Sequence, residues 1–79
     1  SAAAQCESFA MGLLATLYDA GEVTPRDAAQ ALAYAVADGQ LRHRPPSDDA
    51  LRDRLAEPVD DATLAVARQQ GQRLAAACR

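Results

Sequence analysis

Cys6 and Cys78 are the only cysteines of this 79-residue chain, and they lie close to its two ends. A bond between them would close nearly the whole chain into one loop, and a cross-link over such a loop stabilises a fold by about 4 kcal/mol. Each cysteine also falls on the apolar stripe of a helical pattern at its end of the chain. The sequence therefore predicts a Cys6–Cys78 disulfide and an oxidising location, either periplasmic or secreted.

The interior of this chain is expected to be thin. Twenty residues are alanine, there is no tryptophan, and the aromatic side chains are Phe9, Tyr18 and Tyr34. A chain of 79 residues forms one small domain that buries a low fraction of its surface, so a covalent staple would add stability that the core lacks. The larger apolar side chains expected in the core are Phe9, Met11, Leu13, Leu14, Leu17, Leu32, Val36, Leu51, Leu55, Leu64 and Leu74.

Apolar residues recur at helical spacing along the chain, and no segment alternates as a strand would. The predicted fold class is all-α: a single four-helix domain, bundle-like or orthogonal, closed by one disulfide. Residues 1–5 are expected to be a disordered remnant of a signal-peptide cleavage site or of cloning, and residues 6–79 the helical domain. The expected helices span residues 3–20, 25–38, 48–57 and 61–78.

Local signals mark the expected helix ends. Gly21 is suited to end the first helix and Gly39 the second, because glycine accepts the left-handed conformation that follows many helices. Pro25 is favoured at the first position of the second helix, and Asp27 stands where the acid of a capping box belongs. The expected N-caps of the three later helices are Thr24, Ser47 and Asp60.

The first helix is predicted to be the central one, because it is apolar over most of its circumference. Its apolar stripe consists of Cys6, Phe9, Ala10, Leu13, Leu14 and Leu17, widened by Met11 and Tyr18. The remaining strip is polar or small: Ser8, Gly12, Ala15 and Asp19. The inward stripe expected on the last helix consists of Leu64, Ala67, Gly71, Leu74, Ala75 and Cys78.

Few residues could carry chemistry. His43 is the only histidine, no nucleophile with a catalytic signature accompanies it, and both cysteines are assigned to the disulfide, so neither an enzyme nor a metal site is predicted. No cofactor is expected; haem binding by Met11, Tyr18, Tyr34 or His43 is the alternative to packing. The net charge of −3 argues against nucleic-acid binding, and the uncharged run from Phe9 to Tyr18 is too short to insert across a membrane.

Arg42, His43 and Arg44 form a basic cluster before the stiff Pro45–Pro46 pair, on a chain that is otherwise acidic. Local charge opposite to the background steers a complementary partner. Tyr34 lies on an alanine-rich helix face that leads into this loop, where an exposed aromatic ring can anchor a partner or a second copy of the chain. These four residues, Tyr34, Arg42, His43 and Arg44, are the predicted partner-binding site, and a solvated connecting loop is the alternative interpretation.

One stretch of the chain resembles a known family. Val23 and Thr24 precede an amphipathic helix, a Leu-Arg-His-Arg-Pro run follows at residues 41–45, and the next helix carries Leu51 and Leu55. This arrangement resembles the helical periplasmic immunity proteins that protect bacteria from type VI secreted amidase effectors. The resemblance implies a small, disulfide-bonded, non-enzymatic protein that plugs the active site of a toxin, often as a dimer. The chain differs from that family in having fewer cysteines and a fourth helix.

The predicted function is therefore protein binding without catalysis, in the form of an immunity-type inhibitor of a secreted effector. The chain is also similar in size and cysteine content to the small helical, single-disulfide periplasmic chaperones of acid stress. A periplasmic chaperone or a carrier of a small haem-type ligand is accordingly the first alternative. A docking module of a larger protein is the second alternative, and it would require free thiols.

Overall fold

Helices make up all the regular structure of residues 8–21, 27–55 and 58–78, which are the residues that the computed structural model describes. The predicted all-α class is confirmed for this part of the chain. Its helices are α1 (Ser8–Ala20), α2 (Ala28–Leu41), α3 (Asp48–Arg54) and α4 (Asp61–Ala76). Among these residues, no helix is both long enough and apolar enough to cross a membrane.

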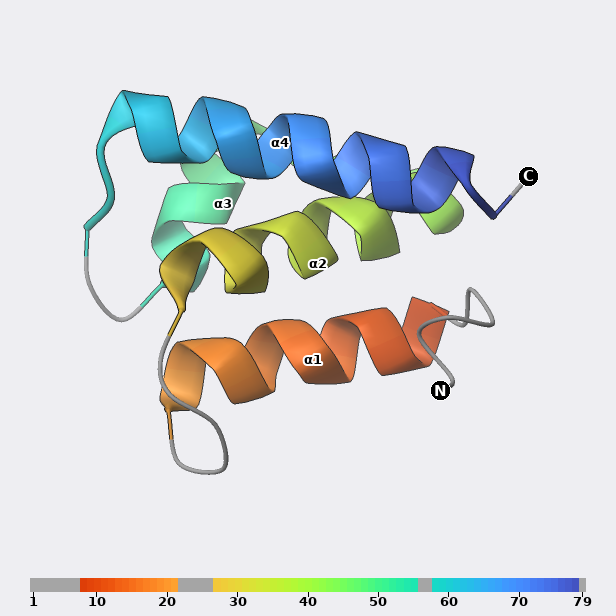
Figure 1. The fold of residues 1–79 in the computed structure, drawn as a ribbon, viewed down its shortest axis with the longest axis horizontal. Helices are drawn as coiled ribbons and strands as arrows, with labels where there is room; N and C mark the ends of the chain where they lie inside the picture. The colour runs from red at the N-terminus through yellow and green to blue at the C-terminus, as the bar shows by residue number, and fades with distance from the viewer. Residues whose placement is uncertain (1–7, 22–26, 56–57, 79) are drawn as a thin grey trace.

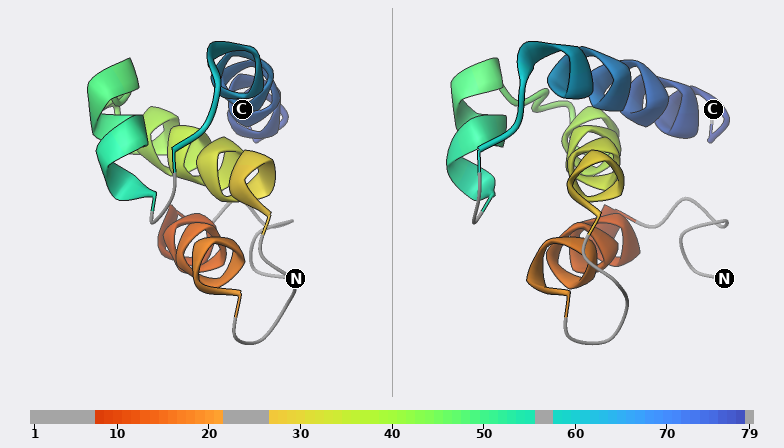
Figure 2. Two further views of the ribbon diagram at one scale, coloured as in Figure 1. Left: turned by 90° about the vertical axis from the view of Figure 1, so that its left-hand side faces the viewer. Right: turned by 60° about the vertical axis from the view of Figure 1, so that its left-hand side comes forward.

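The central helix is α2, not α1 (Figure 1). α1 packs along one side of α2 and α4 along the other, while the short α3 lies beside one end and touches α2 more sparsely. α1 runs antiparallel to α2, whereas α4 follows the general direction of α2 because α3 returns the chain to the starting end. Figure 2 shows that α4 crosses α2 at an angle. The prediction of a central first helix is therefore wrong.

The composition of α2 explains its central place. Small side chains on opposite faces of α2 let a helix approach from either side, and only Leu32 and Val36 among its buried residues are bulky. Alanine has little apolar surface, so a pattern based on large side chains does not reveal a helix that is buried on two sides. The buried residues of α2 are Ala31, Leu32, Ala33, Ala35, Val36 and Ala37.

At Gly71 the backbone of α4 lies very close to α2. A Cβ atom built on Gly71 would lie 2.5 Å from the carbonyl oxygen of Ala33 and 2.5 Å from the Cβ atom of Val36. The two backbones can approach this closely only because Gly71 has no side chain. The predicted inward stripe of α4 is confirmed for Leu64, Ala67, Gly71 and Ala75, which are buried, while Leu74 and Cys78 are half-buried.

The face that α1 turns toward α2 differs from the predicted one. Met11 and Ala15 are buried, with 2% and 0% of their surface exposed, although Ala15 was assigned to the polar strip. Leu13, which was predicted to be in the core, is 50% exposed. The small side chain of Ala15 lets α1 settle close to the equally small side chains of α2, and this contact sets the rotation of the helix.

α2 begins three residues later than predicted. Asp27 has an extended backbone (φ −140°, ψ 97°), and its Oδ1 accepts a hydrogen bond from the Gln30 N–H at 3.1 Å, so Asp27 is the N-cap. The backbone N–H of Asp27 donates to the Tyr18 carbonyl oxygen at 3.0 Å, which ties the start of α2 to α1. Thr24 and Pro25, the predicted start, lie outside the described residues.

α2 also extends past its predicted end, because Gly39 does not close it. The backbone N–H of His43 donates to the Gln40 carbonyl oxygen (3.1 Å), and that of Arg44 donates to the Gly39 carbonyl oxygen (2.8 Å). This pair of bonds is a Schellman motif, with His43 in the left-handed position at φ 58°. Gly39 serves a different purpose: a Cβ atom there would lie 2.6 Å from Pro46 Cδ and 2.8 Å from the Arg44 carbonyl oxygen.

The remaining helix ends largely match their local signals. Gly21 has φ 70°, and its N–H donates to the Leu17 carbonyl oxygen, as expected for a glycine that ends α1. Ser47 Oγ accepts from the Ala50 N–H at 3.1 Å, and Asp60 Oδ1 accepts from the Thr63 N–H at 2.7 Å, so both predicted N-caps are confirmed. α3 ends at Arg54 and α4 at Ala76, whereas residues 57 and 78 were predicted.

Of the two cysteines in the predicted disulfide, only Cys78 lies within the described residues. Cys6 and residues 1–5 fall outside the described ranges, so the pairing stays a prediction. The beginning of α1 and the end of α4 lie at the same end of the molecule (Figure 1). Cys78 follows directly on that end of α4, is half-buried, and has its Sγ 3.2 Å from the Leu74 carbonyl oxygen.

Candidate binding surfaces

The end of α2, the following loop and α3 together surround a hollow of about 230 Å³. Arg42 and Arg44 come from the end of α2 and the loop, as the sequence predicted, and Arg54 reaches the same hollow from α3. We call the surface formed by these three residues the arginine hollow. Arg54 had no distinguishing signal in the sequence, because its place beside the other two depends on how α3 folds back along α2.

The arginine hollow carries an excess of positive charge. Arg42 Nε donates to Asp38 Oδ1 at 2.8 Å, and Asp38 is the one carboxylate among the described residues that line the hollow. Arg54 Nη2 lies 3.5 Å from the Gly12 carbonyl oxygen, which is neutral. Arg44 is exposed and forms no ion pair with any residue of the described ranges. Among the described residues of the hollow, three cations therefore accompany one carboxylate.

The floor of the arginine hollow is apolar. It consists of small or buried groups, which include Ala35, Ala50 and the almost completely buried Leu51. Pro46 closes one side, where it packs against the backbone of Gly39. The Schellman bonds and this contact hold the loop against α2, so the guanidinium groups project from a fixed frame. A carboxylate side chain of a partner can enter such a site without reorganising the loop.

His43 has a backbone role in this frame. It is exposed, its φ of 58° is the left-handed turn that redirects the chain after α2, and its side chain is not among those that line the hollow. Its role in binding a partner stays a prediction.

Tyr34 lies on a different surface from the arginine hollow. Its ring stacks on that of Tyr18 from α1, with ring centroids 5.8 Å apart and an interplanar angle of 7°. Tyr34 is half-buried, which agrees with the expectation that it would be at least partly exposed. The structure therefore brings Arg42 and Arg44 together but separates Tyr34 from them.

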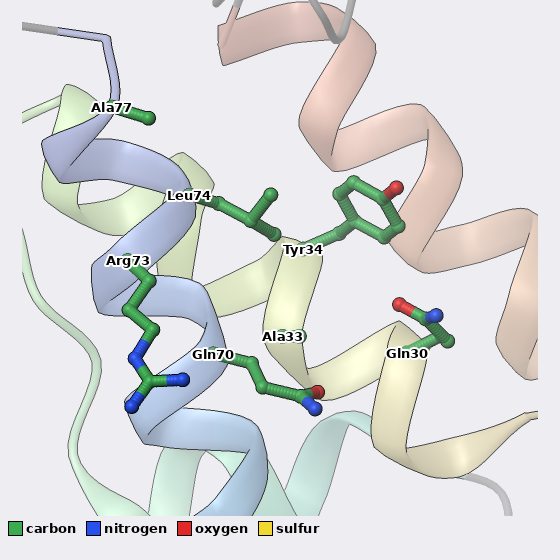
Figure 3. A pocket seen from close by; sticks show the side chains of 7 residues that line it. All are labelled: Gln30, Ala33, Tyr34, Gln70, Arg73, Leu74 and Ala77. Atoms are coloured by element: carbon green, nitrogen blue, oxygen red, sulfur yellow. The ribbon is translucent and has the colours of Figure 1, made fainter.

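Tyr34 lines a groove of about 390 Å³ between α2 and α4 (Figure 3). We call it the α2–α4 groove. In Figure 3, Leu74 points from α4 toward the Tyr34 ring, and the side chains of Gln30 and Gln70 extend from the two helices beside Ala33. The residues that line the groove are Gln30, Ala33, Tyr34, Gln70, Arg73, Leu74 and Ala77.

A third hollow, between α3 and α4, is occupied by internal ion pairs. Arg68 Nε donates to Asp48 Oδ1 at 3.2 Å, and Arg68 Nη2 donates to the Pro46 carbonyl oxygen at 3.1 Å. Arg52 pairs with Asp61 across the same two helices. Because these charges are matched within the chain, the ion pairs hold α3 against α4. They leave little unpaired charge with which a ligand could interact.

The residues that could bind a metal or a haem do not lie together in the described part of the chain. The described part of the chain contains no group of three or more His, Cys, Asp or Glu side chains placed to hold a metal ion. Met11 is buried in the core, Tyr18 and Tyr34 stack on each other, and His43 lies in the loop after α2. These four side chains therefore form no common haem pocket.

Comparisons with known proteins provide no relative. A scan against protein families, a search of curated proteins and a search of solved structures each gave no match to this chain.

Proposed function

We propose that this chain is a non-enzymatic protein-binding domain that recognises an acidic segment of a partner protein through the arginine hollow. The observation that carries the proposal is the grouping of Arg42, Arg44 and Arg54 around an apolar floor, with Asp38 as the single carboxylate among the described lining residues. Guanidinium groups bind carboxylates through paired hydrogen bonds, which gives both charge and geometric selectivity.

The electrostatic setting favours a protein partner with local negative charge. The whole chain has a net charge of −3, so a long polyanion such as a nucleic acid is repelled by most of its surface. A short acidic segment meets only the arginine hollow, where attraction dominates at close range because salt screens the more distant charges. Complementary charge of this kind raises association rates and selects among partners.

The rigidity of the loop supports the same function. Binding costs conformational entropy whenever a loop or side chain has to be ordered. Here the backbone of Arg44 is already held by its bond to the Gly39 carbonyl oxygen, and Arg42 is held by Asp38. Less ordering is therefore left to occur when a partner binds.

The class of partner and the location extend this proposal. In line with the resemblance to helical immunity proteins, the partner is a secreted effector whose active site the domain plugs, and the domain acts in the periplasm or outside the cell. A Cys6–Cys78 disulfide belongs to the proposal, and it is supported by the start of α1 and the end of α4 lying at the same end of the molecule. A second copy of the chain is the alternative protein partner.

Binding of a fluorescently labelled, glutamate-rich peptide tests the recognition step. The double substitution R44A/R54A should weaken binding about threefold to tenfold, since exposed charge pairs contribute modestly, and it should reduce the salt dependence. R73A removes a positive charge outside the hollow and serves as the matched control. Equal binding by the parent and by R44A/R54A would show that the acidic partner does not use the arginine hollow.

The same variants test the choice of partner. Each is immobilised and exposed to periplasmic and secreted proteins of the source organism, and the captured proteins are identified by mass spectrometry. The proposal expects a protein that is retained by the parent and by R73A but lost from R44A/R54A. Inhibition of that protein's enzymatic activity by the purified domain would support the immunity-type role, and unchanged activity would contradict it.

A further inference from the structure

We propose that the outer face of α1 is a contact surface for a second copy of this chain, and that two copies form a reversible, two-fold symmetric dimer through it. The face consists of Leu13, Leu14, Leu17 and Ala20, and we call it the α1 stripe. Leu13 is 50% exposed, Ala20 is exposed, and Leu14 and Leu17 are half-buried. None of these residues lines the arginine hollow, so the proposal goes beyond the proposed function.

A comparison of α1 with α4 shows that the α1 stripe is unusual for a surface helix. Both helices pack against α2 and form an outer edge of the molecule (Figure 1). A helix in this position normally presents polar side chains to water. α4 does so: its exposed Val66 shares a face with the exposed Gln69 and Arg73, three and seven residues later. The outer face of α1 instead presents leucines, which is typical of a surface that another molecule covers.

The absence of charge from the α1 stripe favours a second copy as the partner. Asp19 is the one charged residue of α1, and it follows the buried Ala15 by one helical turn, so it lies on the side away from the stripe. Two copies, each with a net charge of −3, repel each other, but contact through the stripe brings no charge against a like charge. A second copy also supplies an equally apolar surface, which is the requirement for a self-complementary two-fold contact.

The position and size of α1 determine how strong this dimer can be. No other helix of the described ranges lies on the side of α1 that faces away from α2, so a second α1 can approach along its whole length (Figures 1 and 2). A helix of 13 residues is about 20 Å long, and one face of it buries on the order of 300 to 400 Å² per copy. This is about half of the area per partner in a standard stable interface, so the dimer is weak and reversible.

Sedimentation of the full-length chain over a range of concentrations tests for the dimer. The mass of 8.3 kDa expected at low concentration should rise toward twice that value, with a dissociation constant of about 100 μM. Intact mass under denaturing conditions should remain that of a single chain, which excludes a disulfide-linked dimer. A mass of one chain at every concentration up to about 1 mM would overturn the proposal.

Two matched substitutions place the contact on α1. L13D puts a carboxylate into the α1 stripe, where dimer formation would bury it without a partner, so the dissociation constant should rise about tenfold or more. V66D makes the same kind of change at the other large apolar residue that is 50% exposed, on α4, and it adds the same charge to the chain. It should change the dissociation constant about twofold at most, through added repulsion alone. Equal effects of the two substitutions would overturn the proposal.

Nuclear magnetic resonance of the parent chain locates the contact without any substitution, so the test does not depend on the folding of L13D. On dilution, the backbone amide signals of Leu13, Thr16 and Leu17 should shift, because these residues leave the dimer contact. The signals of Val66 and Arg44 should stay constant. Shifts confined to α4 or to the loop after α2 would place the contact elsewhere and contradict the proposal.

Salt separates this proposal from the proposed function. Raising the salt concentration from about 50 mM to about 500 mM should strengthen the dimer, because it screens the repulsion between two negatively charged copies. The same change should weaken binding of the glutamate-rich peptide to the arginine hollow. A dimer that salt weakens would be held by charge, as when the arginine hollow of one copy binds acidic residues of the other, and the α1 stripe would not be its contact. L13D should bind the peptide as the parent does, so either proposal can fail without the other.

Discussion

The backbone of Gly71 passes Ala33 so closely that a Cβ atom on Gly71 would lie 2.5 Å from the Ala33 carbonyl oxygen. Real Cβ atoms essentially never approach an oxygen atom to that distance, and a backbone oxygen in the middle of α2 cannot move aside as a flexible side chain can. The contact between α2 and α4, on which the fold depends, therefore rests on the absence of one methyl group.

G71A should destabilise the domain by about 3 kcal/mol, because overpacking of this kind forces the two helices apart. Urea unfolding followed by circular dichroism measures the loss. G12A is the matched control, since its Cβ atom would meet Asp38 Oδ2 at 3.5 Å, an ordinary contact. It should be neutral or stabilising by up to about 1 kcal/mol, owing to the better helix propensity of alanine. Similar stability for both variants would show that the helices are less closely packed than we infer.

His43 occupies a backbone position that glycine adopts without strain. A left-handed conformation costs a residue with a side chain about 1 kcal/mol or more. H43G should therefore be more stable than H43A by about 1 kcal/mol, even though glycine gains more freedom on unfolding. Both variants lack the imidazole ring, so the difference between their free energies of unfolding reports the cost of the left-handed backbone conformation. Equal urea midpoints for the two variants would argue against the left-handed turn after α2.

The N-cap of α4 should make stability depend on pH. Hydrogen bonds from the Thr63 hydroxyl and backbone N–H lower the pKa of the Asp60 carboxyl below its usual value. The contribution of Asp60 to stability is therefore fully present above the ordinary aspartate pKa, and it is lost as pH falls through the lowered value. D60N keeps a capping side chain that does not titrate, so its stability should fall less between neutral and acidic pH. A parallel loss in both proteins would contradict this assignment.

The Cys6–Cys78 disulfide gives a further prediction. Protein purified without reductant should contain no thiol that can be alkylated, and intact mass after treatment with iodoacetamide measures this. Reduction should lower the free energy of unfolding by about 3 to 4 kcal/mol, since the bond closes a long loop. The C6S/C78S variant should match the reduced protein. Two alkylated thiols in the untreated protein would remove both the disulfide and the basis for an oxidising location.

Much of the candidate site could be read from the sequence, but its assembly could not. Arg42 and Arg44 lie where the basic run placed them, beside a loop made stiff by proline. Arg54 joins them only because α3 folds back along α2, which no local pattern encodes. Tyr34 was expected next to the same loop, but helix geometry turns its side chain toward the α2–α4 groove instead.

The sequence by itself determined the local structure: the all-α class, the end of α1 at Gly21, the starts of α3 and α4 at Ser47 and Asp60, and the buried stripe of α4. These features depend on hydrogen bonds and periodicity within a few residues of one another. The tertiary structure alone decided that α2 is central and that Ala15, rather than Leu13, faces it. The physical reason is that a small side chain stabilises the fold only where another helix packs closely against it. The distance between two helices is set by the packed tertiary structure.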